Sequence, residues 1–168
     1  MACTIYAVAS EDKAKPGNMA RPRLGDWLED ELLSVSQQHF EVIVSLLEEE
    51  EAAELDLNDE SSLSAWHGIQ FVRIPISDRG VPALDDATMA ALSSLRTLWR
   101  EGKAILTQCR MGGGRAPMIA ACVMVSKKCG SEEAFAKLSA ARGIAVPESD
   151  EQRLSVQKYV ELVRREKK

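Results

Sequence analysis

The residues best suited to chemistry lie in one short run, 107–115, which reads Thr-Gln-Cys-Arg-Met-Gly-Gly-Gly-Arg. Five residues separate Cys109 from Arg115, and three of them are glycines. An apolar stretch precedes the run and a helix-like stretch follows it, which predicts a glycine-rich turn between a strand and a helix. Backbone N–H groups in such a turn point inward and attract an anion.

The same arrangement favours a reactive sulfur. Partial positive charge at a helix start stabilises a thiolate, so we expect Cys109 to be a nucleophile. The Arg115 guanidinium can grip two oxygens of a phosphate. A thiolate that faces a phosphate held in this way is equipped for phosphoryl transfer through a covalent cysteine intermediate.

A candidate proton donor lies upstream, in the run 74–82 (Ile-Pro-Ile-Ser-Asp-Arg-Gly-Val-Pro). Displacing an alcohol or phenol from phosphorus requires a proton for the leaving oxygen, which Asp78 could supply from a mobile loop. Taken alone, an aspartate before a glycine is typical of a turn. Together with Cys109 it is interpreted as a general acid, because both residues follow predicted strands and parallel strands end at the same edge of a sheet.

Strand-like and helix-like segments alternate along the chain. The expected strands are 4–9, 41–47, 69–76 and 103–107. The expected helices start near residue 26 and occupy 85–99, 115–128, a segment opening at 131, and 151–165. Residues 11–24 are rich in proline and glycine and are predicted to be a loop. This order predicts a single α/β domain spanning 1–168, with a mostly parallel central sheet of four to five strands and helices on both faces.

Composition limits the partners. The 168-residue chain has a net charge of −5, which does not favour nucleic acid or acidic membranes. No apolar run approaches membrane-spanning length, and the N-terminus lacks a signal-peptide pattern. The four cysteines and two histidines show no zinc-site spacing, so we expect no metal and no cofactor. A reducing, cytoplasmic location fits a thiolate nucleophile.

The Cys-x-x-Gly-x-x-Arg pattern at 109–115 resembles the signature loop of the cysteine-dependent protein tyrosine and dual-specificity phosphatases. The Pro-Ile-x-Asp-x-Gly-x-Pro pattern at 75–82 resembles the general-acid loop of their compact members, notably the cyclin-dependent-kinase-associated phosphatase branch and its bacterial relatives. The resemblance runs from about residue 21 to residue 159. It implies a dual-specificity phosphatase-like fold.

The resemblance also implies a two-step reaction, in which Cys109 forms a phosphocysteine and Asp78 first donates and then accepts a proton. Gln152 resembles the late glutamine that places water in the second step, although an exposed polar residue in the first turn of a helix is an equally open interpretation. The phosphate would be held by the turn amides and by Arg115, in the set Arg110, Met111, Gly112, Gly113, Gly114 and Arg115. Expected ligands are a phosphorylated protein or small phosphomonoester as substrate, and phosphate, sulfate or vanadate as active-site anions.

Two departures from the family pattern stand out. Gln108 replaces the usual histidine before the nucleophile, and Ala116 replaces the usual serine or threonine after the arginine. The missing hydroxyl would have donated a charge-assisted hydrogen bond to the thiolate, worth about 1.5–3 kcal/mol. We therefore expect slower breakdown of the phosphocysteine. Two alternatives stay open: a catalytically weak module that binds phosphorylated ligands, and a rhodanese-like sulfurtransferase, which needs no upstream aspartic acid.

Overall fold

The computed structural model describes residues 4–9 and 15–167 and contains a five-stranded sheet with the strand order β1-β2-β5-β3-β4. Strands β2, β5, β3 and β4 are parallel, and the short edge strand β1 is antiparallel to β2. The strands are β1 (Tyr6–Ala7), β2 (Pro16–Ala20), β3 (Val42–Ser45), β4 (Gln70–Arg73) and β5 (Ile105–Cys109). The predicted fold class, a mostly parallel α/β sheet of four to five strands, is confirmed.

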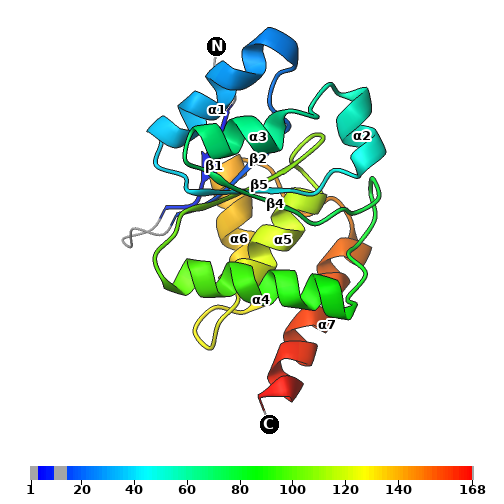
Figure 1. Ribbon diagram of the computed structural model, residues 1–168. Helices are drawn as coiled ribbons and strands as arrows, with labels where there is room; N and C mark the ends of the chain where they lie inside the picture. Colours follow the sequence, from blue (N-terminus) through cyan, green and yellow to red (C-terminus); the bar gives the residue numbers. More distant parts are fainter. Residues whose placement is uncertain (1–3, 10–14, 168) are drawn as a thin grey trace.

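Helices cover both faces of this sheet (Figure 1). They are the 3₁₀ turn η1 (Gly25–Trp27), α1 (Leu28–Gln37), α2 (Glu49–Glu54), α3 (Glu60–Trp66), α4 (Asp86–Arg100), α5 (Arg115–Met124), α6 (Ser131–Arg142) and α7 (Asp150–Glu166). Apolar residues of α1 form one core cluster with the sheet face that carries Leu106. The other cluster lies between the opposite face and α4, α5, α6 and α7. Both faces are thus buried, as parallel sheets require.

The prediction of a loop over 11–24 was wrong for residues 16–20, which form strand β2 beside β5. Pro16 is tolerated because it stands at the first position of the strand. Gly17 is required by packing, since a Cβ there would lie 2.9 Å from the Phe40 ring. Local signals from proline and glycine were therefore overridden by a parallel pairing with a segment about ninety residues away. Residues 10–14 lie outside the described part of the chain.

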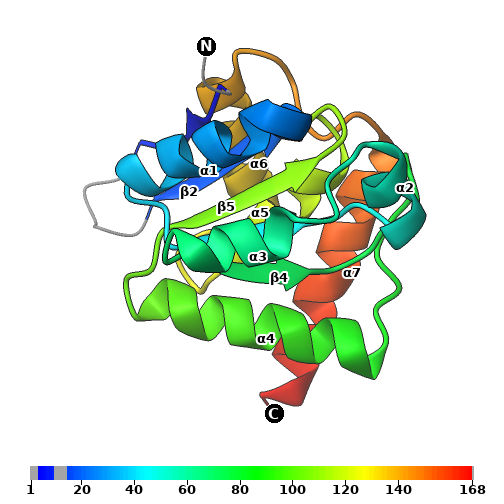
Figure 2. The same ribbon diagram turned by 45° about the horizontal axis from the view of Figure 1, so that its top comes forward.

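The parallel strands end at one edge of the sheet, where the functional motifs follow. Ser45 at the end of β3 is in register with Gln108, one residue before Cys109. The arrowheads of β5 and β4 point toward α2 and the start of α7 (Figure 2). This edge therefore gathers segments that lie far apart in the sequence, as is typical of ligand sites in parallel sheets.

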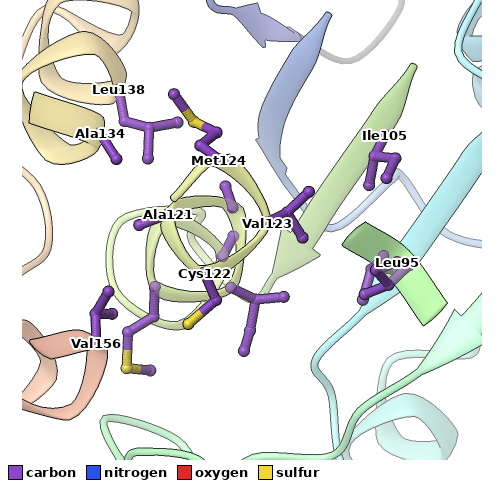
Figure 3. Packing of buried hydrophobic residues seen from close by; sticks show 14 of the residues in the cluster. Leu95, Ile105, Ala121, Cys122, Val123, Met124, Ala134, Leu138 and Val156 are labelled. Carbon is purple, nitrogen blue, oxygen red and sulfur yellow. The ribbon is translucent and has the colours of Figure 1, made fainter. Parts of the chain in front are cut away.

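Helix α5 is the central helix of the fold, and every one of its residues is buried. It packs on β5 and β2 and is flanked by α4, α6 and α7 (Figure 3). Cys122 points into this core, where burial raises the pKa of its thiol to about 12. The helix ends at Met124 rather than at the predicted residue 128, because Val125 adopts an extended conformation with ψ of 130°. None of the helices in the described part of the chain is long and apolar enough to span a membrane.

Candidate active site

Cys109 is the last residue of β5, and 3% of its surface is exposed. Two backbone amides donate hydrogen bonds to its Sγ, that of Gly112 at 3.2 Å and that of Ala116 at 3.4 Å. Gly112 has a φ of 79°, and a Cβ there would lie 2.8 Å from backbone atoms of Met19 and Ala20. The turn therefore needs glycine at this position to bring its amides to the sulfur.

Arg115 begins α5 and is almost fully buried. Its Nη1 donates to a carboxylate oxygen of Glu51 at 2.7 Å and to the carbonyl of Ile76 at 2.8 Å. Its Nη2 donates to the other oxygen of Glu51 at 2.8 Å and to Asp78 at 3.3 Å. These bonds fix the plane of the guanidinium beside the Cys109 loop, because a bidentate carboxylate pair allows little rotation.

Glu51 is a site residue that the sequence analysis missed. It lies in α2, directly beyond the end of β3, and its carboxylate also accepts from Arg110 Nε at 3.2 Å. The hydrogen bond from Arg115 is the main cause that lowers the pKa of Glu51 to about 2, against the opposing effect of burial. Glu51 sits in an acidic run that reads as a solvated helix face. Only its position after a buried strand could have indicated a role.

The Asp78 loop reaches the same place from β4. The Asp78 carboxylate contacts Arg115, yet 59% of its side chain is exposed. The neighbouring Arg79 has a φ of 61°, the left-handed conformation of a tight turn, and Gly80 donates its N–H back to the Ser77 carbonyl at 2.8 Å. Asp78 is thus held near the guanidinium at the solvent-exposed rim of the site.

Gln152 lies in the first turn of α7 but is not exposed: only 1% of its surface is accessible. The interpretation of Gln152 as an exposed polar residue was therefore wrong. Its Nε2 donates to the carbonyl of Gly80 at 3.5 Å and lies 2.8 Å from where a Cβ of Gly114 would be. Its Oε1 is buried and has no hydrogen-bond partner among the described residues. Its role in placing water stays a prediction.

Two further side chains that the sequence analysis missed contact the loop. Arg142, the last residue of α6, donates to the carbonyls of Gly112 at 2.8 Å and Met111 at 3.0 Å. These bonds hold the carbonyls of Met111 and Gly112 on the outside of the turn, while the Gly112 amide faces Cys109 Sγ on the inside. Glu148 also lines the cavity, with one carboxylate oxygen 2.8 Å from where a Cβ of Gly113 would be. A larger residue at position 113 would require this flexible carboxylate to move.

These groups line a cavity of about 510 Å³. Its wall is formed by Asp78, Arg79, Cys109, Arg110, Met111, Gly113, Gly114, Arg115, Glu148, Ser149 and Gln152. All the predicted catalytic residues reach it, and so do the predicted phosphate contacts other than Gly112, whose N–H is turned to the sulfur. Over residues 4–9 and 15–167, no group of three or more His, Cys, Asp or Glu side chains is placed to hold a metal ion.

Several solved structures share this architecture. The kinase-associated phosphatase KAP, in a form whose catalytic-site cysteine is replaced by serine, matches with a TM-score of 0.83 at 18% identity, over 98% of this chain and 97% of that one. Tk-PTP in its active form matches with a TM-score of 0.69 at 24% identity, over 93% and 97%. PTPMT1 in complex with PI(5)P matches with a TM-score of 0.70 at 16% identity, over 94% and 96%. At these identities the matches show the fold.

The sequence itself places the chain in a family. No curated protein sequence matches it. The model of the Tc-R-P family, described as the DSP-PTPase phosphatase of polymorphic toxin systems, matches residues 17–129, which include most of β2, all of β5 and the whole of the Cys109 turn. The chain therefore belongs to the Tc-R-P family of DSP-PTPase phosphatases.

Proposed function

We propose that this protein hydrolyses phosphomonoesters, such as phosphotyrosine, through a phosphocysteine intermediate and without a metal. The observation that carries the proposal is the convergence of Cys109, Arg115 and Asp78 on one cavity, with two backbone amides directed at the sulfur. Family membership supports the phosphatase class. It favours neither the binding-only alternative nor the sulfurtransferase alternative.

In the first step the Cys109 thiolate attacks phosphorus. The bond between sulfur and phosphorus forms while the bond to the leaving oxygen breaks, and the Asp78 carboxylic acid gives its proton to that oxygen. The turn amides and Arg115 hold the three equatorial oxygens and stabilise their charge in the transition state. Arg115 does so with its Nε–H and with the Nη2–H that Asp78 releases. Its other Nη hydrogens stay bonded to Glu51 and Ile76. Glu51 and the Ile76 carbonyl orient Arg115 for this task.

In the second step water attacks the phosphocysteine, and the Asp78 carboxylate accepts its proton. The buried Gln152 side chain supports a role in placing that water, because its unpartnered Oε1 can accept a hydrogen bond from it. The thiolate then leaves, stabilised by the amides of Gly112 and Ala116. Phosphate is released and the site returns to its starting state.

Assays with para-nitrophenyl phosphate and a phosphotyrosine peptide, in the presence of a metal chelator, test this proposal. Wild type should release phosphate from both, and thiosulfate should give no thiocyanate with cyanide. The substitution Asp78→Asn should lower kcat by about 10²–10³-fold for the peptide and less for para-nitrophenyl phosphate, whose leaving group needs a proton less.

The control for Asp78→Asn is Asp86→Asn, an exposed acid in the first turn of α4 with the same loss of charge, which should keep wild-type rates. Full phosphatase activity in Asp78→Asn would contradict the general-acid assignment. Thiocyanate production that is independent of Asp78, with no phosphate release, would instead identify a sulfurtransferase.

Restoring the missing hydroxyl should speed the second step. In Ala116→Ser the new side chain lies beside the amide that already donates to Sγ at 3.4 Å, so its hydroxyl can add a charge-assisted bond to the departing thiolate. We expect breakdown of the phosphocysteine to be about tenfold faster. Rapid-quench kinetics would show this as less phosphoenzyme at steady state. Ala140→Ser, at an exposed helical position, should change nothing, and equal phosphoenzyme levels in wild type and Ala116→Ser would contradict the expectation.

A further inference from the structure

The residue before the nucleophile makes an unusual contact on the far side of the sheet. Side chains alternate along a strand, so Gln108 points away from the face that carries Cys109. Gln108 is fully buried, and its Nε2 donates to Oε1 of Glu60, the first residue of α3, which is also fully buried. A carboxyl group thus lies behind the end of β5, one residue from the sulfur.

The remaining oxygens of this pair are unmatched. Gln108 Oε1 and Glu60 Oε2 are both buried, and neither has a hydrogen-bond partner in the described part of the chain. A carboxylate offers only acceptors, so an ionised Glu60 would leave two acceptors without donors in a site closed to solvent. A carboxylic acid carries one donor and one acceptor, which complement the acceptor and donor of an amide.

The groups around the Gln108–Glu60 pair are polar, but none of those described forms a salt bridge with the Glu60 carboxyl. Ser64 follows Glu60 by one helical turn, and Ser45 is in register with Gln108 on β3. Both hydroxyls are buried without a partner among residues 4–9 and 15–167. Arg73 on β4 acts on Glu60 electrostatically. Helix α1, which also packs against α3, carries the buried Glu31 paired with Arg23, and Glu29 beside His67.

Burial has the largest effect on the pKa of the Glu60 carboxyl. It raises the pKa of Glu60 from its ordinary value of 4.5 to about 7, although the hydrogen bond from Gln108 and the charge of Arg73 act in the opposite direction. The fold therefore stabilises the protonated form. This stabilisation is complete below pH 4.5 and is lost as the pH rises through about 7.

We propose that protonated Glu60 is a positioning residue for the phosphatase site: it closes a two-hydrogen-bond ring with the Gln108 amide and so fixes the end of β5 that carries Cys109. The proposal rests on the proposed function for its effect on turnover. When Glu60 loses its proton, the second bond of the ring is lost and a negative charge appears behind the thiolate. The negative charge disfavours the reactive, ionised form of Cys109. The lost hydrogen bond allows the Cys109 loop to depart from its reactive geometry.

The pH dependence of kcat/KM, measured from about pH 5 to about pH 9 with para-nitrophenyl phosphate, tests this inference. Wild type should lose activity about tenfold as Glu60 ionises. Glu60→Gln forms the same ring with an amide that does not titrate, so its alkaline loss should be about tenfold smaller than that of wild type, and its activity near pH 6 should stay within about twofold of wild type. Glu60→Ala, which cannot form the ring, should be about tenfold less active at every pH.

Asp59→Asn is the matched control, because it removes an exposed carboxylate one residue away and should keep the wild-type profile. Two readouts do not need turnover. The ¹³C resonance of the Glu60 carboxyl should titrate near pH 7, and above that pH iodoacetamide should alkylate Cys109 faster in Glu60→Gln than in wild type. Absence of hydrolysis in every variant would refute the phosphatase function while these readouts still report on the ring. A Glu60 carboxyl that titrates near 4.5, or an alkaline loss as large in Glu60→Gln as in wild type, would overturn the inference.

Discussion

Replacing Cys109 by serine should lower kcat with para-nitrophenyl phosphate by at least about 10⁴-fold, to the level of the assay background. A serine hydroxyl at the end of β5 is not ionised at neutral pH, and the amides of Gly112 and Ala116 cannot make it a comparable nucleophile. The cavity walls and the Arg115 contacts stay the same. Binding of phosphate or of a phosphotyrosine peptide, measured by calorimetry, should therefore persist in Cys109→Ser.

A second cysteine provides the control for this result. Cys129 is half-buried, lies beyond the end of α5 and does not line the cavity, so Cys129→Ser should retain wild-type turnover. Loss of phosphate binding together with turnover in Cys109→Ser would indicate a damaged loop rather than a missing nucleophile. Retention of more than about a tenth of the wild-type kcat in Cys109→Ser would contradict the phosphocysteine mechanism.

Replacing Arg115 by lysine should lower kcat/KM by about 10³-fold, even though the charge is kept. The guanidinium makes two bonds to Glu51, one to the Ile76 carbonyl and one to Asp78 at the same time. A single ammonium group cannot reproduce this planar array and also meet phosphate oxygens. The substitution Arg115→Lys thus loses both the clamp on the transition state and the link to the general-acid loop.

Arg110→Lys is the comparison for this change. Arg110 bonds the same Glu51 carboxylate, but 38% of its side chain is exposed at the cavity wall, so we expect less than a tenfold loss. Thermal unfolding of both variants separates loss of function from loss of fold, because Arg115 is buried and its bond to Glu51 also supports the packing of α2. A kcat/KM for Arg115→Lys within about tenfold of wild type would contradict the role given to the guanidinium.

The sequence alone determined the parts of this protein that depend on local chemistry. The spacing of Cys109 and Arg115, the glycines between them and the apolar residues before them already specify a strand, a tight turn and a helix start. Gly112 must be glycine because of its own backbone conformation, which a local pattern can reveal. The alternation of apolar strand-like segments with helix-like segments likewise predicted the parallel sheet, although it missed strand β2.

Tertiary structure decided which distant side chains serve that turn. Glu51 grips Arg115 across 64 positions of sequence, Gln108 meets Glu60 across 48, and Gln152 reaches Gly80 across 72. Glu51 and Glu60 read locally as solvated surface groups, the sequence leaves the role of Gln152 open, and the strand that begins at Pro16 reads as a loop. Their burial depends on which elements become neighbours at the sheet edge. The packing of the whole chain determines these neighbours, so no short sequence pattern can reveal them.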